Sequence, residues 1–226
     1  MKYTENEISL LKTHHFEMWN LVQTQVNRSF QALERADANL AREVLSREKY
    51  VNAQELVVDH HCENFIALYA PVAVDLRFVI SLLKITNNLE RIGDFAESIA
   101  LFVFKHLKEP LSKELWKALK MDNMMHTAQE MLSVARTSLT AGKSDDCGKI
   151  LAMDDILDEI NARAVSVLAG YIRSHPDAAE DMLYTSAVIR RIERIGDRVE
   201  NIAEDIVFFI DAKELRHLKD LDQPTG

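Results

Sequence analysis

Apolar residues recur every three or four positions along most of the chain, which is the spacing of one buried face of an α-helix. No segment shows the alternating pattern of a half-buried strand. Turn-forming residues interrupt the helical pattern at a few places, among them Pro71, Glu109-Pro110 and Ala141-Gly142. The pattern predicts six helices, over about residues 4–35, 40–68, 71–108, 112–139, 147–170 and 174–218, before a loose tail at 222–226.

Signals at the ends of some predicted helices support these boundaries. Thr4 and Glu7 have the spacing of a capping box, which places the start of the first helix there. Asp37-Ala38-Asn39 can end that helix and cap the next one. Gly142 is a typical C-terminal stop before a turn. The chain is therefore expected to consist of long helices joined by short connections.

A block of the chain occurs twice in nearly the same form. Residues 88–100, Asn-Leu-Glu-Arg-Ile-Gly-Asp-Phe-Ala-Glu-Ser-Ile-Ala, return at 191–203 as Arg-Ile-Glu-Arg-Ile-Gly-Asp-Arg-Val-Glu-Asn-Ile-Ala. The shift is 193 − 90 = 103 positions, close to half of the 226 residues. Such a repeat indicates two copies of one structural unit. We therefore predict an all-α fold of two tandem antiparallel three-helix bundles, residues 1–109 and 110–226.

The repeated block carries a row of acidic residues beside an apolar stripe. In helical geometry, residues three and four apart lie on one face. Like charges at this spacing destabilise a helix, so the row is an unusual choice for stability. The row contains Glu90, Asp94 and Glu97 in the first copy and Glu193, Asp197 and Glu200 in the second.

A glycine interrupts each acidic row. Gly93 and Gly196 lie in the interior of predicted helices, where glycine costs about 1 kcal/mol relative to alanine. Both copies accept this cost, which indicates that a neighbouring helix passes close to each glycine. The acids beside that close approach then need a group that neutralises them.

A second polar pair precedes each row. Asp154 and Asp158 are four residues apart, and Glu48 and Asn52 occupy the corresponding positions of the first half. If two antiparallel helices bring the pair against the row, each half gathers four oxygen-bearing side chains. Oxygen-only sites suit hard or borderline cations such as Mg, Mn, Ca or oxidised Fe.

The plain alternative to a metal site is a solvated helix face. Arg91, Arg194 and Arg198 are close enough in sequence to pair with the acids. An isolated Glu-x-x-x-Asp would favour that interpretation. The duplication of the row, the two glycines and the matching upstream pairs favour the metal site instead.

Composition narrows the possible functions. A net charge of −9 argues against nucleic acid as a partner. Cys62 and Cys147 are isolated, and we expect both to be buried apolar residues rather than ligands or a disulfide. No run of apolar residues is long enough for a transmembrane helix, and the start of the chain lacks an apolar signal core. A cytoplasmic protein without a membrane-spanning helix is therefore expected.

The doubled motif resembles the PhoU family. The resemblance rests on two motifs, Pro-x-Ala-x-Asp-Leu-Arg at 71–77 and Leu/Ile-Glu-Arg-Ile-Gly-Asp at 89–94 and 192–197. The resemblance covers nearly the whole chain. It implies a cytoplasmic negative regulator of phosphate uptake and of the phosphate-starvation response, not an enzyme. The implied partners are the ATPase subunit of a phosphate ABC transporter, a membrane sensor histidine kinase and a second copy of the chain.

The resemblance also implies bound metal. Some members of the family bind iron or other metal clusters through paired Glu/Asp-x-x-x-Asp motifs, so divalent or trivalent ions (Fe, Mn, Mg or Zn) are the expected cofactors. The lower charge at Asn52 is expected to make the first site hold metal more weakly. Carried onto this chain, the ligands are Glu48, Asn52, Glu90 and Asp94 in the first half and Asp154, Asp158, Glu193 and Asp197 in the second.

Three other functions compete with this interpretation. Residues 154–158 match the Asp-Asp-x-x-Asp by which all-helical prenyl synthases hold diphosphate through Mg, but no second copy occurs. Glu214-Leu215-Arg216-His217 is the one Glu-x-x-His in the chain, where a ferritin-like di-iron oxidase needs two. The strongest rival is a metal-binding helical adaptor that regulates another ion transporter.

Overall fold

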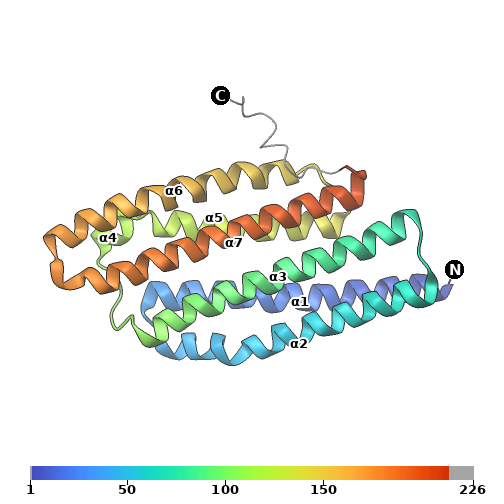
Figure 1. Ribbon diagram of the computed structural model, residues 1–226, viewed down its shortest axis with the longest axis horizontal. Coiled ribbons are helices and arrows are strands. Elements are labelled where there is room, and N and C mark those ends of the chain that lie inside the picture. Colours follow the sequence, from blue (N-terminus) through green and yellow to red (C-terminus); the bar gives the residue numbers. More distant parts are fainter. Residues whose placement is uncertain (1, 214–226) are drawn as a thin grey trace.

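The computed structural model describes residues 2–213 of the chain, with side chains from Glu5 onward. The described residues contain no strand, which confirms the all-α prediction (Figure 1). The helices are α1 (Lys2–Arg35), α2 (Ala38–Tyr69), α3 (Ala73–Lys105), α4 (Lys113–Ala118), α5 (Met121–Ala141), α6 (Cys147–Ser174) and α7 (Ala179–Asp211), with a 3₁₀ turn, η1 (Pro176–Ala178), before the last.

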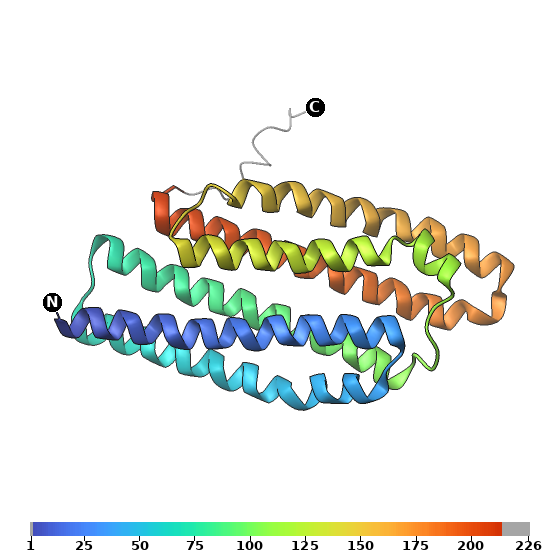
Figure 2. The same cartoon turned by 180° about the vertical axis from the view of Figure 1, so that it is seen from behind.

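The helices form two bundles that lie side by side. Helices α1, α2 and α3 make the first bundle, and α5, α6 and α7 make the second (Figures 1 and 2). The α3 and α7 helices run antiparallel along the middle of the molecule, α2 and α6 lie at its outer edges, and α1 and α5 form a second layer. The two tandem bundles are therefore confirmed, while the division at residues 109 and 110 stays a prediction.

Most predicted helix boundaries are close to those observed. Asp37 caps α2, because its Oδ1 accepts hydrogen bonds from the backbone N–H groups of Asn39 and Leu40 at 2.9 and 3.0 Å. Gly142 ends α5 in the left-handed conformation. The capping box at Thr4 is wrong, since α1 already begins at Lys2 and places this residue inside the helix.

The predicted helix over 112–139 is divided in the structure. Lys120 adopts the left-handed conformation between α4 and α5. Leu115, Leu119 and Met121 are all buried. In a continuous helix the last two would point roughly 200° apart and could not both reach the core. The break lets both side chains turn inward, a gain that the apolar spacing alone did not reveal.

The second half departs from prediction at two further helix ends. Helix α6 continues past Gly170 to Ser174. Helix α7 ends at Asp211, with Ala212 in the left-handed conformation, rather than near Leu218. The predicted tail and the Glu214–His217 motif lie outside the described residues.

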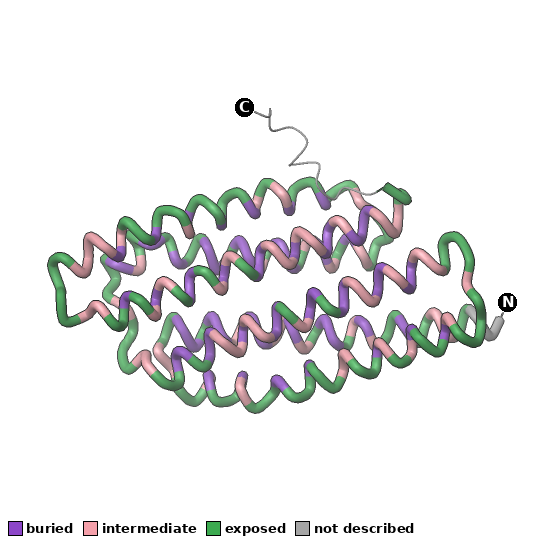
Figure 3. Tube along the Cα trace, in the orientation of Figure 1, coloured by how far each residue is buried: buried purple, intermediate pink, exposed green. Residues whose placement is uncertain are grey.

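The core follows the facing sides of the helices. Buried positions line the interior of each bundle and the contact between the bundles (Figure 3). Trp19 is completely buried, and Cys62 and Cys147 are buried, as predicted. None of the helices described between residues 2 and 213 has the length and apolar character needed to cross a membrane.

Polar contacts also join the two bundles. Arg136 of α5 donates to Gln23 Oε1 of α1 at 2.9 Å. On the other layer, Lys84 Nζ of α3 lies 3.5 Å from Asp205 Oδ1 of α7, and this carboxylate is buried. The first contact joins α5 to α1 and the second joins α3 to α7, so both layers are connected across the two bundles.

The two repeated glycines mark close helix contacts, as the sequence predicts. A Cβ atom at Gly93 of α3 would lie 3.1 Å from Val51 Cγ1 of α2. A Cβ atom at Gly196 of α7 would meet Leu157 Cδ1 and lie 2.9 Å from Asp154 Oδ1, both on α6. The second contact is tighter, and Leu157 is fully buried in the core.

Alanine at the two glycines is expected to have unequal effects. Gly196→Ala should lower the free energy of unfolding by about 1–2 kcal/mol, because crowding outweighs the better helix propensity. Gly93→Ala should be nearly neutral. Gly170→Ala is the control, since a Cβ added there meets no neighbouring atom within 4 Å. Its free energy of unfolding should rise by up to about 1 kcal/mol. Urea unfolding measures all three, and a Gly196→Ala variant as stable as Gly93→Ala would contradict the assigned contact.

A second expectation concerns His15 of α1. The ring is buried, with Nδ1 3.2 Å from Thr86 Oγ1 and an edge contact to Trp19. Burial lowers the pKa of His15 to about 3. The unfolded chain binds a proton at His15 near pH 6.5, whereas the folded protein binds it only near pH 3. The stability gained by keeping His15 neutral is therefore complete above pH 6.5 and is lost as the pH falls toward 3.

The measurement is unfolding by denaturant at several pH values. Relative to His15→Gln, the wild-type protein should lose up to about 1.4 kcal/mol per pH unit between roughly pH 6 and pH 4. His126→Gln, at a side chain that is 77% exposed, serves as the control and should follow the wild type. Parallel curves for the wild type and His15→Gln would show that the ring is not kept neutral.

Candidate metal centre

The acidic site of the second half lies between α6 and α7. Asp154 occupies the same face of α6 as the core residues Ile150 and Leu157, and it is therefore buried. Its carboxylate faces Gly196, and a side chain there would occupy the space beside Asp154 Oδ1. The glycine thus makes room for a carboxylate, which explains why it lies in the middle of the acidic row.

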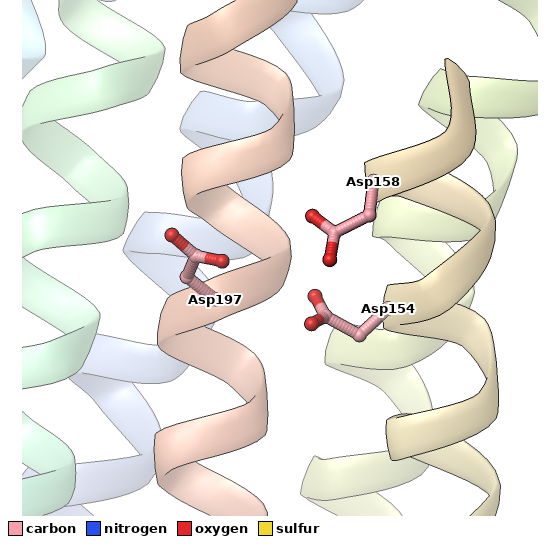
Figure 4. A group of neighbouring side chains, drawn as sticks. All are labelled: Asp154, Asp158 and Asp197. Atoms are coloured by element: carbon pink, nitrogen blue, oxygen red, sulfur yellow. The ribbon is translucent and has the colours of Figure 1, made fainter. Parts of the chain in front are cut away.

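Three of the predicted ligands of the second half come together. Asp154 and Asp158 of α6 and Asp197 of α7 each offer one carboxylate oxygen, and these oxygens lie within 4.8 Å of one another. Figure 4 shows Asp154 and Asp158 directed from α6 toward α7, the helix that carries Asp197. Asp154 is buried, Asp197 is half-buried and Asp158 is exposed, so the group opens toward solvent on one side.

The electrostatics of the second site oppose negative charge. Burial, followed by the charges of Glu200, Asp197 and Asp158, raises the pKa of the Asp154 carboxyl to about 8. Burial and Asp158 also raise the pKa of Asp197. Without a counter-charge, these acids favour protonation at a pH at which isolated aspartates are ionised.

The fourth predicted ligand, Glu193, lies on the same row of α7. Burial is the largest cause of the raised pKa of Glu193, and the charges of Asp197 and Asp158 raise that pKa further. Arg194 has the opposite effect. Its Oε2 is buried without a hydrogen-bond partner. Asp154 Oδ1 has no partner either. Buried carboxylate oxygens are rarely left without a donor, and a nearby cation is one way to satisfy such an oxygen. Glu193 is not among the acids whose oxygens converge within 4.8 Å.

The first half repeats this arrangement between α2 and α3. Glu48 is buried with its carboxylate next to Gly93, which is the relation of Asp154 to Gly196. Burial raises the pKa of Glu48 to about 7, and a hydrogen bond from Gln25 Nε2 at 3.1 Å opposes the shift. Glu48 Oε1 has no partner.

Two differences separate the first site from the second. Arg91 pairs with the acidic row there, with Nη1 3.0 Å from Asp94 Oδ2 and Nε 3.6 Å from Glu90 Oε2. Asn52 is exposed. Within the described residues, only the second half gathers three acidic oxygens as closely as a single ion requires.

Sequence reasoning left three nearby acids out of the ligand set. Glu97 and Glu200 follow the Asp of each row by one turn, and their charges raise the pKa values of Glu48 and Asp154. Glu97 and Glu200 occupy the same position after the Asp of each copy, and this repetition in the sequence indicates that both belong to the acidic sites. Glu55, one turn beyond Asn52, raises the pKa of Glu90, and no duplicated residue indicates it, because Asn161 occupies the equivalent position.

The donor set determines which ions the site could take. Carboxylates alone suit Mg, Mn, Ca or oxidised Fe, whereas a structural zinc site normally includes Cys or His. Asp154, Asp158 and Asp197 could hold one such ion, with Glu193 and Glu200 next to them. The orphan oxygens and the raised pKa values fit a cation at this place.

Comparison with known proteins supports the resemblance seen in the sequence. The chain matches the PhoU domain twice, over residues 16–103 and 121–206. The phosphate-specific transport system accessory protein PhoU of Edwardsiella tarda is 32% identical over 222 residues, which cover 96% of this chain and 89% of that protein. The protein of the same name from Escherichia coli strain K12 is 31% identical over 215 residues, covering 94% and 87%.

Solved structures agree with the fold. The crystal structure of PhoU from Pseudomonas aeruginosa superposes with a TM-score of 0.87 at 29% identity, over 92% of this chain and 99% of that one. The phosphate transport system regulatory protein PhoU from Streptococcus pneumoniae, with a TM-score of 0.79 at 22% identity, shows the same fold. Because the domain matches cover both halves and the relatives align over nearly the whole length, the chain belongs to the PhoU family.

Proposed function

We propose that this protein is a cytoplasmic accessory protein of a phosphate transport system that restrains phosphate uptake and the phosphate-starvation response. The observation that carries the proposal is the match of both repeats to the PhoU domain, together with relatives named phosphate-specific transport system accessory proteins. The protein acts by binding other proteins rather than by catalysis. Its partners are the ATPase subunit of a phosphate ABC transporter, a sensor histidine kinase and a second copy of itself.

Metal ions occupy the acidic sites in this proposal. An ion between α6 and α7 would be held by Asp154, Asp158 and Asp197, with Glu193 beside it. The first site, between α2 and α3, would use Glu48, Glu90 and Asp94, with Asn52 at its exposed edge. Support comes from the oxygen atoms without partners and from the carboxyl groups whose pKa values are raised.

An ion at either site would join two helices of one bundle. It would replace the repulsion between the facing acids by attraction and so stabilise the pair of helices. The surface around the site would also become less negative. Binding of a partner could therefore depend on metal through both the shape and the charge of this face.

The regulatory role predicts a defect in cells that lack the protein. Deletion of the gene should raise expression of a phosphate-starvation reporter in phosphate-rich medium, and the intact gene should restore repression. Affinity purification of the tagged protein should recover the ATPase subunit of the phosphate transporter. A reporter that stays low, or recovery of the ATPase of a different ion transporter instead, would contradict the assigned system.

The metal proposal predicts a specific loss on substitution. Asp154→Asn should weaken binding of Mn²⁺ or Fe³⁺ at the second site by about tenfold or more, because it removes a charged ligand at the centre of the group. Asp155→Asn, an exposed neighbour on the same helix, should bind as the wild type does. Elemental analysis after dialysis and the rise in melting temperature on adding metal are the measurements.

The two sites can be compared in the same way. Glu193→Ala should remove more metal than Glu90→Ala, since Arg91 already pairs with the acids of the first row. Equal losses would show that the sites do not differ in affinity. Unchanged metal content in Asp154→Asn would refute the metal proposal while leaving the regulatory one intact.

A further inference from the structure

A cavity outside both acidic sites lies between the end of α3 and the beginning of α7. Its volume is about 290 Å³. Three of its lining residues carry basic groups, Lys105, His106 and Arg191, and the rest of the lining is Ser98 with apolar and aromatic side chains. None of the lining residues in the described part of the chain is acidic. This is unusual in a protein with 36 acidic and 27 basic residues.

Arg191 is held in place at the side of the cavity. Its Nε donates a hydrogen bond to Ser98 Oγ across the contact between α7 and α3, at 2.8 Å. In residues 5–213 it forms no ion pair with a carboxylate, and neither does Lys105 (the ion pairs of this region involve other residues). The terminal N–H groups of the guanidinium remain for a ligand, and their fork matches the oxygens of a phosphate or carboxylate.

This arginine is specific to the second repeat. The equivalent residue of the first copy, 191 − 103 = 88, is Asn88. Its side chain is satisfied within α3, where Nδ2 donates to the carbonyl oxygen of Lys84 at 3.1 Å. The duplicated framework therefore does not require an arginine here, and its charge needs another explanation.

Aromatic rings form the other wall. His106 and Tyr184 stack with ring centroids 3.9 Å apart and planes inclined at 23°. Phe102 lies behind them, 6.1 Å from Tyr184 and 6.3 Å from His106 between centroids. This stack connects α3 to α7, and the rings of Phe102 and Tyr184 give the cavity an aromatic side in addition to its basic groups.

The size of the cavity limits the ligand. It has the volume of roughly ten water molecules in the liquid and lies at the lower end of the range for small-molecule sites. Inorganic phosphate alone would leave the apolar wall uncovered. A phosphate monoester carries a charge between about −1 and −2 near neutral pH, which suits the Arg and Lys groups that line the cavity, and its organic part can cover the rings.

We propose that this cavity binds a small phosphate monoester with a planar or apolar organic group. Arg191 and Lys105 hold the phosphate, and the rings of Phe102 and Tyr184 contact the organic part. A neighbouring cavity shares Phe102 and His106 but includes Glu109 and Asp181 in its lining. The phosphate is therefore directed to the Arg191 side. The site is distinct from both acidic sites, because no residue of either acidic row lines it.

Calorimetric titration of the full chain with phenyl phosphate tests the proposal. Phenyl phosphate should bind and should bind more tightly than inorganic phosphate or benzoate. Arg191→Met should weaken binding by about tenfold or more, and Arg190→Met, its exposed neighbour on α7, should not. Lys105→Met provides a second variant, because Lys105 is exposed and its loss cannot disturb the core; it should weaken binding as well.

Several outcomes would overturn the assignment. Absence of phenyl phosphate binding would do so, as would equal losses in the Arg190 and Arg191 variants. Inorganic phosphate binding as tightly as phenyl phosphate would refute the role of the aromatic wall. Circular dichroism of each variant verifies that it is folded, and retained binding by both Arg191→Met and Lys105→Met would place the ligand elsewhere.

Discussion

Each half of the protein buries one carboxyl group in the space that a glycine leaves open on the facing helix. Glu48 lies against Gly93, and Asp154 lies against Gly196. A buried carboxylate without full hydrogen bonding is costly, and the cost is reduced either by taking up a proton or by a nearby cation. The raised pKa values of Glu48 and Asp154 show the tendency to take up a proton. The surrounding acids supply further ligands with which a cation could be bound instead.

The acidic sites and the contact between the two bundles use different faces of α3 and α7. The acidic rows follow the outer helix pairs, α2 with α3 and α6 with α7, while α3 and α7 meet each other along the middle (Figure 1). The contact between those two helices has different chemistry, with the Lys84–Asp205 ion pair and the Arg191–Ser98 hydrogen bond. A single helix can therefore present acids to one neighbour and basic groups to another, because its faces repeat every 3.6 residues.

The sequence was sufficient for the helical architecture and for the positions of the central acids. Periodicity and the duplicated block specify long helices and two equivalent halves, and the glycine in each block indicates the close contact. Local patterns could not predict the break at Lys120, because it depends on which side chains reach a core made by other helices. They could not predict the cavity beside Arg191 either, since its walls come from segments about 90 residues apart in the chain.

The two acidic sites carry the same number of acidic groups in spite of Asn52. Asn52 lowers the charge of the first pair, but Glu55 follows it, whereas in the second half Asp158 is followed by Asn161 (158 − 52 = 161 − 55 = 106). The exchange leaves the total acidic charge of the two sites equal.

What differs is how the charge is neutralised within the protein. The first site has the Gln25 hydrogen bond to Glu48 and the Arg91 ion pairs. In the second, Asp154, Asp158 and Asp197 converge within 4.8 Å. The buried carboxyl group of each half leaves one oxygen without a partner, Glu48 Oε1 in the first and Asp154 Oδ1 in the second. Repulsion that a protein does not relieve internally increases the free energy gained when a cation binds. The partners that the first site already has are therefore the physical reason for proposing tighter metal binding at the second.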